Sequence, residues 1–332
     1  MDKVTLGRSG LKVPPLCFGT WELGGEWGAV DESAATATIR RAREEGINFF
    51  DTAQGYGFGA SERLLGTALA EDLRSARDEV VIATKGGLRR QGGATVRDSS
   101  PEWLREGVDA SLRALGVDFI DLYQVHWPDP NTPFAATADA LGELVHVGKI
   151  RHVGVSNFAV DQMEAFAQHG PLETLQPPYH MFRREIEDSV LPYCHAHDIG
   201  VLVYGPLAHG LLTGTMGPST TFAPDDWRSQ SADFSGETFR RNLGVVNTLK
   251  ELAAERDVSL PALAVAWTIA NPMVDVAIFG ATNREQLDDT VRAAHVRLSG
   301  DDIAAIDRIL ADAMPMHGPR PEGMPSSNDQ AL

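Results

Sequence analysis

Four side chains whose types suit proton transfer stand at or just after the ends of short apolar runs. Asp51 follows INFF, Lys85 ends EVVIATK and His126 ends FIDLYQVH, while Tyr56 lies in the Gly-rich loop after Asp51. Apolar runs bounded by glycine and polar residues are typical of buried parallel strands. Because such strands end at one edge, we expect a carboxylate, an ammonium, an imidazole and a phenol around one mouth.

This combination suits the transfer of a proton to a carbonyl oxygen while hydride arrives at carbon. An ammonium about 4 Å from a phenol, at an effective dielectric near 20, stabilises the phenolate by roughly 4 kcal/mol, and burial opposes this. Tyr56 is then the proton donor, Asp51 holds and neutralises Lys85, and His126 hydrogen-bonds the substrate oxygen.

Each of these residues also has a structural interpretation when taken alone. Asp51 would cap a loop, Tyr56 would pack in it, Lys85 would be a solvated strand end and His126 a hydrogen-bonded core histidine. Their convergence on neighbouring strand ends favours the functional interpretation.

The elements that must position these residues alternate between strands and amphipathic helices. Eight strand-then-helix units, the number that closes a parallel barrel, begin with the runs LCFGTW, INFFDT, EVVIATK, FIDLYQVH, KIRHVGVS, LETLQ, GVLVY and VDVAIFG. The fold predicted is a single α/β domain over residues 1–332, a (β/α)8 TIM barrel. A doubly wound open sheet is the rival, but GGEWGAV lacks the G-x-G-x-x-G spacing.

Helices are expected near residues 33–46, 101–115, 134–147, 161–168 and 186–197, across 237–270, and after Ser61, which is the expected cap of ERLLGTALAE. A β-hairpin of residues 4–6 and 11–13 caps the barrel, and two extra helices follow the last strand near 284–294 and 300–312. Residues 314–332, rich in Pro, Gly and Met, form a tail that either drapes over the barrel or is disordered.

Composition excludes several classes of protein. The formal net charge of −17 argues against nucleic acid or anionic membrane as partners, and no apolar run reaches membrane-spanning length. Only two cysteines occur, Cys17 and Cys194, and the N-terminus lacks a secretory apolar core. We therefore expect a cytoplasmic protein with a small-molecule substrate; the sequence leaves the oligomeric state open.

Two loops suit an anionic ligand. The loop YGPLAHGLLTG, residues 204–214, follows the seventh strand, and FGATNREQ, residues 279–286, follows the eighth. Barrels commonly hold phosphate between these loops, and the second loop leads into a helix N-terminus beside Arg284. The structural alternative is a pair of ordinary glycine loops.

Metal catalysis is a weaker hypothesis. His126, His152 and His180 lie near successive strand ends, but His152 sits inside its strand and no carboxylate cluster accompanies it. Trp21, Trp27 and Trp127, with Tyr179 and Phe182, lie in loops that could wall an apolar substrate pocket or simply pack.

The chain resembles the aldo-keto reductases, in the bacterial branch that is also similar to the potassium-channel β subunits. LGRSGLKVPPLCFGTWELGG, INFFDTAQGYGFGASE, GKIRHVGVSNF and YGPLAHGLLTG carry the resemblance, which covers nearly the whole chain. It implies that Asp51, Tyr56, Lys85 and His126 form the catalytic tetrad, with Tyr56 as the acid.

The resemblance also implies a nicotinamide cofactor, NADP(H) with NAD(H) as the alternative, and no metal. The residues implied in cofactor binding are Ser156, Asn157 and Gln176 at the carboxamide, Tyr204 stacked on the ring, Gly205, Leu207, Gly210, Leu212 and Gly214 in the pyrophosphate loop, and Gly280, Thr282, Arg284 and Gln286 around the adenosine ribose and its 2′-phosphate. Residues 216–234 look like a belt that closes over the cofactor.

The leading hypothesis is therefore an NADPH-dependent reductase of aldehydes or ketones. A cofactor-binding redox regulator with slow turnover, as in the channel subunits, is the alternative, and a metal-dependent hydrolase ranks third. Asn283 and Thr290 depart from the residues common in relatives, which leaves the preference between NADP and NAD open.

Overall fold

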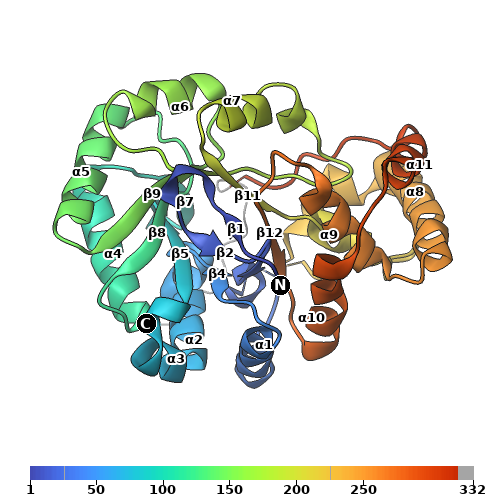
Figure 1. Ribbon diagram of the computed structural model, residues 1–332, viewed down its shortest axis with the longest axis horizontal. Coiled ribbons are helices and arrows are strands. Elements are labelled where there is room, and N and C mark those ends of the chain that lie inside the picture. Colours follow the sequence, from blue (N-terminus) through green and yellow to red (C-terminus); the bar gives the residue numbers. More distant parts are fainter. Residues whose placement is uncertain (26, 225, 321–332) are drawn as a thin grey trace.

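Eight parallel strands form a closed barrel in the computed structural model, which describes residues 1–25, 27–224 and 226–320. The order around the barrel is that of the sequence: β3 (Leu16–Gly19), β4 (Phe49–Asp51), β5 (Val81–Gly86), β8 (Ile120–Val125), β9 (Ile150–Ser156), β10 (Thr174–Gln176), β11 (Gly200–Tyr204) and β12 (Val276–Gly280). β12 pairs with β3 and closes the ring (Figure 1). The (β/α)8 barrel predicted from the eight units is confirmed.

Side-chain alternation along each strand divides the core into two parts. Phe49, Val81, Leu122 and Leu202 point into the barrel, where they form one apolar cluster. Their sequence neighbours on the strands point outward and pack against the helices in a second, larger cluster. Polar residues that follow the inward residues by two positions must therefore also face the barrel axis.

The helices surround the barrel (Figure 1). Their bounds are α1 Glu32–Glu44, α2 Ala60–Ala68, α3 Ala70–Ser75, α4 Pro101–Leu115, α5 Phe134–His146, α6 Val160–Ala167, α7 Val190–Ala196, α8 Gly236–Glu255, α9 Leu260–Ala270, α10 Arg284–Val291 and α11 Gly300–Leu310. The bounds of α4 agree with the prediction because Ser100 caps its first turn, Pro101 starts it and Gly116 ends it in a left-handed conformation. None of the helices within the described ranges is long and apolar enough to cross a membrane.

The N-terminal hairpin, β1 (Val4–Thr5) with β2 (Lys12–Val13), is also confirmed. Leu6 and Val13 from this hairpin are fully buried in the same cluster as the inward residues of the strands. The hairpin therefore closes the end of the barrel opposite the strands' carboxyl ends, and ligands enter from the other side.

Two local predictions differ from the structure. Ser61 is not a cap: α2 begins at Ala60 after Gly59, and the buried Ser61 hydroxyl instead donates to Thr20, with Oγ to the Thr20 carbonyl oxygen at 2.8 Å. A further hairpin, β6 (Leu88–Gln91) with β7 (Ala94–Arg97), is inserted after β5 and was not predicted. Its strands are largely polar, and apart from Leu88 they are only partly buried or exposed, so they lack the apolar pattern of a buried strand.

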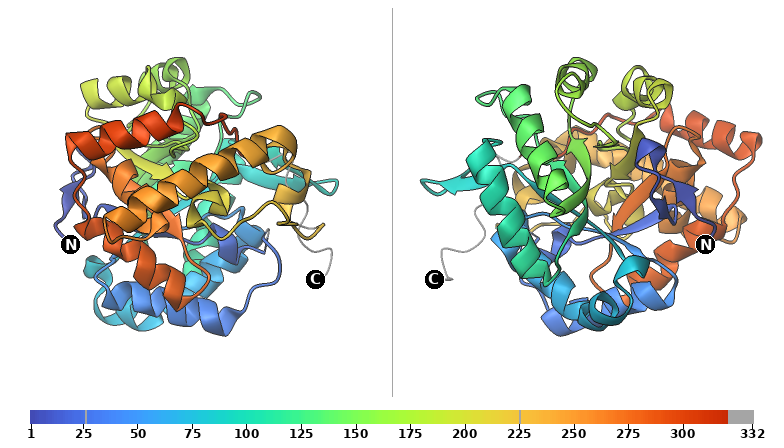
Figure 2. Two further views of the ribbon diagram at one scale, coloured as in Figure 1. Left: turned by 90° about the vertical axis from the view of Figure 1, so that its right-hand side faces the viewer. Right: turned by 60° about the vertical axis from the view of Figure 1, so that its left-hand side comes forward.

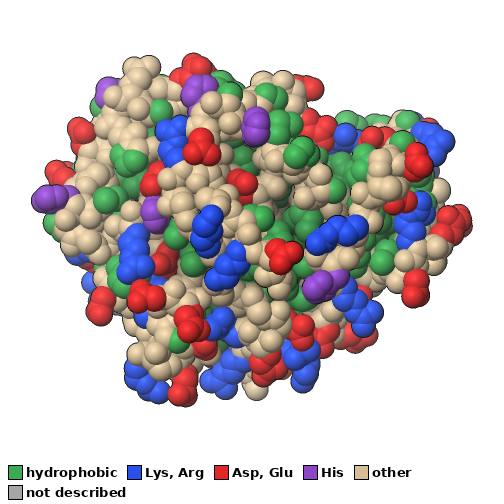
Figure 3. All heavy atoms as spheres, in the orientation of Figure 1, with side chains coloured by type: hydrophobic (Ala, Val, Ile, Leu, Met, Phe, Trp, Pro, Cys, Tyr) green, Lys and Arg blue, Asp and Glu red, His purple; other side chains and the backbone are tan. Residues whose placement is uncertain are grey.

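The two additional C-terminal helices are present as α10 and α11, and α11 packs beside α8 outside the ring (Figure 2). Of the predicted tail, residues 314–320 run back along the molecule, and the Met316 side chain is fully buried. Residues 321–332, which the tail prediction also covered, lie outside the described residues. Acidic and basic side chains are interspersed over the face shown in Figure 3.

Candidate active site

Lys85 is the centre of a hydrogen-bonded group at the carboxyl ends of β4 and β5. Its Nζ lies 2.5 Å from Asp51 Oδ1, 2.9 Å from the Thr52 carbonyl oxygen and 3.2 Å from Tyr56 Oη. An ammonium has three hydrogens, so these three acceptors use all of them. The ammonium is thereby fixed with one donor aimed at the phenol.

Asp51 is held from the other side by side-chain amides that come from β8 and β10. Its Oδ2 accepts from Gln176 Nε2 at 2.8 Å and faces Gln124 Nε2 at 3.5 Å. Burial raises the pKa of Asp51, while the charge and hydrogen bond of Lys85 oppose that rise. Lys85 and Asp51 are each almost completely buried, so the pair is an ion pair shielded from water.

His126 completes the four residues. Its ring stands edge-on to Tyr56 with 5.7 Å between ring centroids, and Nδ1 is buried without a hydrogen-bond partner among the described residues. Burial, and then the charge of Lys85, lower its pKa well below the ordinary value. The imidazole is therefore neutral near neutral pH and carries one N–H for an oxygen of a ligand.

Tyr204 and Asn157 form a second polar group beside the first. The Tyr204 hydroxyl donates to Asn157 Oδ1 at 2.9 Å, and Asn157 Nδ2 donates to the His126 carbonyl oxygen at 3.1 Å. Burial raises the pKa of Tyr204 to about 12, so its hydroxyl is a donor at neutral pH. Ser156 Oγ donates to the Gln176 carbonyl oxygen at 2.8 Å and also faces Asn157 Nδ2. Five of the predicted residues, Tyr204, Asn157, His126, Ser156 and Gln176, thus form one connected network.

One large cavity joins this group to both anion loops. Its volume is about 1150 Å³, and the predicted site residues that line it are Asp51, Tyr56, Tyr204, Gly205, Leu207, Gly210, Gly280, Thr282, Arg284, Gln286, Trp21 and Trp27. Lys85, Ser156 and Gln176 lie buried behind these residues, and His126 adjoins Tyr56. The Leu212 side chain points into the core, and Gly214 ends the short helix η6 (Ala208–Thr213).

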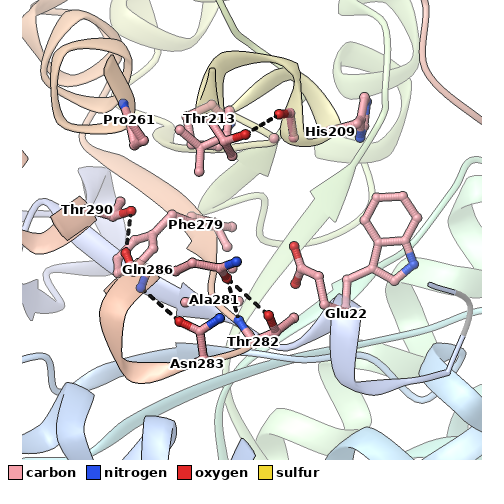
Figure 4. A pocket seen from close by; sticks show the side chains of 18 of the residues that line it. Glu22, His209, Thr213, Pro261, Phe279, Ala281, Thr282, Asn283, Gln286 and Thr290 are labelled. Carbon is pink, nitrogen blue, oxygen red and sulfur yellow. Dashed lines mark hydrogen bonds between the residues drawn. The ribbon is translucent and has the colours of Figure 1, made fainter. Parts of the chain in front are cut away.

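The loop before α10 forms the opposite wall of the cavity (Figure 4). Asn283 caps this helix by accepting from the Gln286 N–H at 3.0 Å, and Gln286 Oε1 in turn accepts from Thr282 N–H at 3.0 Å. Thr290 donates to the Gln286 carbonyl oxygen. Arg284 is largely exposed and lies 3.6 Å from Asp288. These contacts hold the loop in shape before any ligand arrives.

Aromatic side chains pack together in the part of the cavity wall that Trp21, Trp27 and Tyr56 form. Trp21 is stacked between Tyr56 and Trp227, and Trp27 meets Trp21 edge-on with 4.9 Å between ring centroids. Trp127 lies farther out, under the Arg97 guanidinium of the missed hairpin. By contrast, Tyr179 is buried away from the cavity, stacked on Trp267, and Phe182 is also buried, so these two predicted pocket residues belong to the core.

Several residues of the site were not predicted from the sequence. Gln124 is the second amide at Asp51, and a polar residue two positions after inward-facing Leu122 was the available signal. Glu22, His209 and Arg228 line the cavity from segments without regular pattern. Burial lowers the pKa of His209 to about 3, so this imidazole is neutral. Within the described ranges, no group of three or more metal-ligating side chains could hold a metal ion.

The sequence model of the Aldo/keto reductase family matches residues 15–311. The chain belongs to the aldo/keto reductase family. Aldo-keto reductase YhdN of Bacillus subtilis (strain 168) is 41% identical over 95% of both chains. The NADH-specific methylglyoxal reductase of Escherichia coli (strain K12) is 36% identical, over 95% of this chain and 99% of the relative. Two further relatives, from Oryza sativa subsp. japonica and Arabidopsis thaliana, are each named "Probable voltage-gated potassium channel subunit beta".

The solved structure of glycerol dehydrogenase AKR11B4 from Gluconobacter oxydans superposes with a TM-score of 0.86. The two chains are 39% identical, with 96% of this chain and 98% of the other covered. This aldo/keto reductase is accordingly an NAD(P)H-dependent oxidoreductase acting on carbonyl or alcohol groups.

The cavity fits a nicotinamide dinucleotide in most respects. It is large enough, Gly205 and Gly210 adopt left-handed conformations that bring backbone to the cavity wall without a side chain, and the aromatic face of Tyr204 lines its inner end. One residue does not suit an anionic cofactor. Glu22 directs a carboxylate into the middle of the cavity.

Proposed function

We propose that this aldo/keto reductase reduces an aldehyde or ketone to an alcohol, with Tyr56 as the proton donor. The observation that carries the proposal is the position of the Tyr56 hydroxyl, which accepts from Lys85 and adjoins His126 at the inner end of the cavity. A bound reduced nicotinamide cofactor supplies hydride to the carbonyl carbon.

The chain's own residues account for the proton. Because Tyr56 Oη accepts a hydrogen bond from Lys85, the ammonium stabilises the phenolate that remains after the phenol gives its proton to the substrate oxygen. Asp51 holds Lys85 in place, and Gln176 and Gln124 hold Asp51. The neutral His126 ring donates its N–H to the same substrate oxygen.

The cofactor-binding residues are assigned on the same grounds. Tyr204, fixed by Asn157, offers its ring to the nicotinamide, and Asn157 and Ser156 with Gln176 offer polar groups to the carboxamide. The backbone of η6 and the loop before α10 would hold the pyrophosphate and the adenosine ribose. Trp21, Trp27 and Trp127 would bound the substrate.

Tyr56→Phe tests the proton donor. The variant should lower kcat/KM for aldehyde reduction by about 10²- to 10⁴-fold, since it removes a general acid. NADPH binding, followed by quenching of protein fluorescence, should be unchanged. Tyr193→Phe, at a ring that packs at a tilt against His197 outside the site, is the matched control and should keep full activity. A Tyr56→Phe enzyme as fast as the parent would refute the assignment.

NADPH is the proposed cofactor in preference to NADH. Arg284, which lies on α10, would bind the 2′-phosphate of NADPH. Two observations count against this preference: Asp288 partly neutralises the charge of Arg284, and one relative is named as NADH-specific. Side-by-side titrations should give a lower Kd for NADPH than for NADH. The difference between the two Kd values should become smaller in high salt, because salt screens the attraction between an exposed Arg284 and the 2′-phosphate. Equal or tighter binding of NADH would contradict the proposed preference for NADPH.

The kinship with plant channel β subunits supports a second candidate, a cofactor-binding redox regulator with slow turnover. This function predicts tight nucleotide binding together with very slow product release across a broad panel of aldehydes. Rapid multiple turnover of any of these aldehydes would exclude it.

A further inference from the structure

The Glu22 side chain extends from a backbone turn that several contacts hold in place. It lies in η2 (Trp21–Leu23), a short helical turn that follows β3. Thr20, at the start of the turn, donates from its N–H to the Asp51 carbonyl oxygen at 3.0 Å and accepts from Ser61 Oγ at 2.8 Å. Trp21, the next residue, is held between the rings of Tyr56 and Trp227. These contacts hold the turn that carries Glu22.

The carboxylate of Glu22 lies directly against the backbone of Gly280 at the end of β12. β3 and β12 are neighbours in the barrel, with Gly19 opposite Gly280, which places the turn after β3 over the end of β12. A Cβ added to Gly280 would stand 2.1 Å from Glu22 Oε2 and 2.2 Å from Oε1. The carboxylate therefore fills the space that the glycine leaves between the two anion loops.

The charges around Glu22 offset the negative charge of its carboxylate only weakly. The backbone N–H of Glu22 itself stabilises the ionised carboxylate. Within the described residues no side chain makes a hydrogen bond or ion pair with it. Arg228 is the nearest attractive charge, but its guanidinium is already paired with Asp226, with Nη2 to Oδ2 at 2.6 Å. Of the other groups on the cavity wall, His209 is neutral, Tyr56 faces Lys85, and Arg284 pairs with Asp288 on α10. Burial accordingly raises the pKa of Glu22 to about 7.

We propose that the Glu22 carboxylate is a built-in negative charge that competes with the cofactor's pyrophosphate for the space beside Gly280, and so sets the affinity for the nucleotide. This inference rests on the proposed function. An incoming pyrophosphate must displace the carboxylate or meet its repulsion. Like charges in contact inside a partly dry cavity repel more strongly than in water.

The test is nucleotide affinity of Glu22→Gln at about pH 8, where the parent carboxylate is mostly ionised. The variant keeps the size of the side chain and removes its charge. It should bind NADPH at least about fivefold more tightly, which corresponds to ~1 kcal/mol, the repulsion of two unit charges about 4 Å apart in water. Affinity for ADP should rise similarly, while affinity for uncharged adenosine should not change.

Glu251→Gln is the matched control, since Glu251 is an exposed carboxylate on α8 that does not line the cavity. It makes the same change in net charge and should alter NADPH affinity less than twofold. An equal increase of NADPH affinity in both variants would show that the net negative charge of the protein repels the nucleotide in general, and it would overturn the inference. Unchanged affinity in Glu22→Gln, in a protein with an unaltered circular dichroism spectrum and Tm, would overturn it too. A parent protein and a variant that both bind no nucleotide would instead overturn the proposed function, and the inference with it.

Discussion

At the scale of the residue, the site depends on a buried ammonium whose hydrogens all have acceptors. Asp51, Thr52 and Tyr56 supply these acceptors to Lys85 within 3.2 Å. Such an arrangement orients the phenol, but it also places two charges out of water. The stability of the pair therefore depends on both partners being present.

Asp51→Leu should lower the free energy of unfolding by about 3–5 kcal/mol, because it leaves the Lys85 ammonium buried without its counter-charge. Urea unfolding followed by circular dichroism measures this. The double variant Asp51→Leu/Lys85→Met should recover part of the loss, because it removes the second charge as well. Carbonyl reduction should stay lost in both proteins. A double variant that is less stable than Asp51→Leu would contradict this account of the ion pair.

At the scale of the element, the C-terminal segment 314–320 links parts of the chain that are distant in sequence. Asp233 Oδ2, in the belt between β11 and α8, accepts from the N–H groups of His317 and Gly318 at 3.1 and 3.0 Å. Arg183, in the loop after β10, donates to the His317 carbonyl oxygen. Met316 N–H donates to the Phe182 carbonyl oxygen at 2.9 Å. The segment thus ties the belt to the opposite loop.

Asp233→Ala should release this segment, because it removes a carboxylate that accepts two backbone hydrogen bonds. Amide hydrogen exchange at His317 and Gly318 should become at least about tenfold faster, as expected when ~1.4 kcal/mol of protection is lost. Asp312→Ala, at an exposed side chain just before the segment, should leave both amides protected. Unchanged exchange in Asp233→Ala would show that the other contacts of the segment, such as the burial of Met316, are enough to hold it.

At the scale of the whole molecule, buried histidines link the stability of the barrel to pH. The pKa values of His126, His180 and His209 are all lowered, in each case chiefly by burial. The unfolded chain therefore takes up protons below its ordinary histidine pKa of about 6.5 that the folded protein does not. The stability from this source is complete above that pKa and is lost progressively as the pH falls below it.

His180→Gln should reduce this pH dependence. His180 is almost fully buried, and its ring accepts from the Phe182 N–H at 3.2 Å. Between about pH 6 and pH 4.5, the slope of unfolding free energy against pH should fall by up to ~1.4 kcal/mol per pH unit. Urea unfolding across that range measures the slope. His146→Gln, at an exposed histidine, is the control. If its slope changed as much as that of His180→Gln, burial would be refuted as the cause.

The barrel and the candidate catalytic residues can be predicted from sequence patterns alone. Short apolar runs alternating with amphipathic helices predict eight parallel strands, and strand ends in a closed barrel must share one mouth. Asp51, Lys85 and His126 could be placed there because each follows a strand with a clear apolar pattern. Their roles in catalysis follow from the chemistry of their side chains and stay predictions until Tyr56→Phe is measured.

Only the tertiary structure decided how segments without such a pattern meet. The exposed β6–β7 hairpin, the buried position of Ser61 and the course of residues 314–320 depend on contacts between distant parts of the chain. The same holds for Glu22, since nothing in the sequence TWELGG shows that its carboxylate lies on Gly280, far along the chain. Barrel closure brings β3 beside β12, and that closure is what places this charge in the cavity.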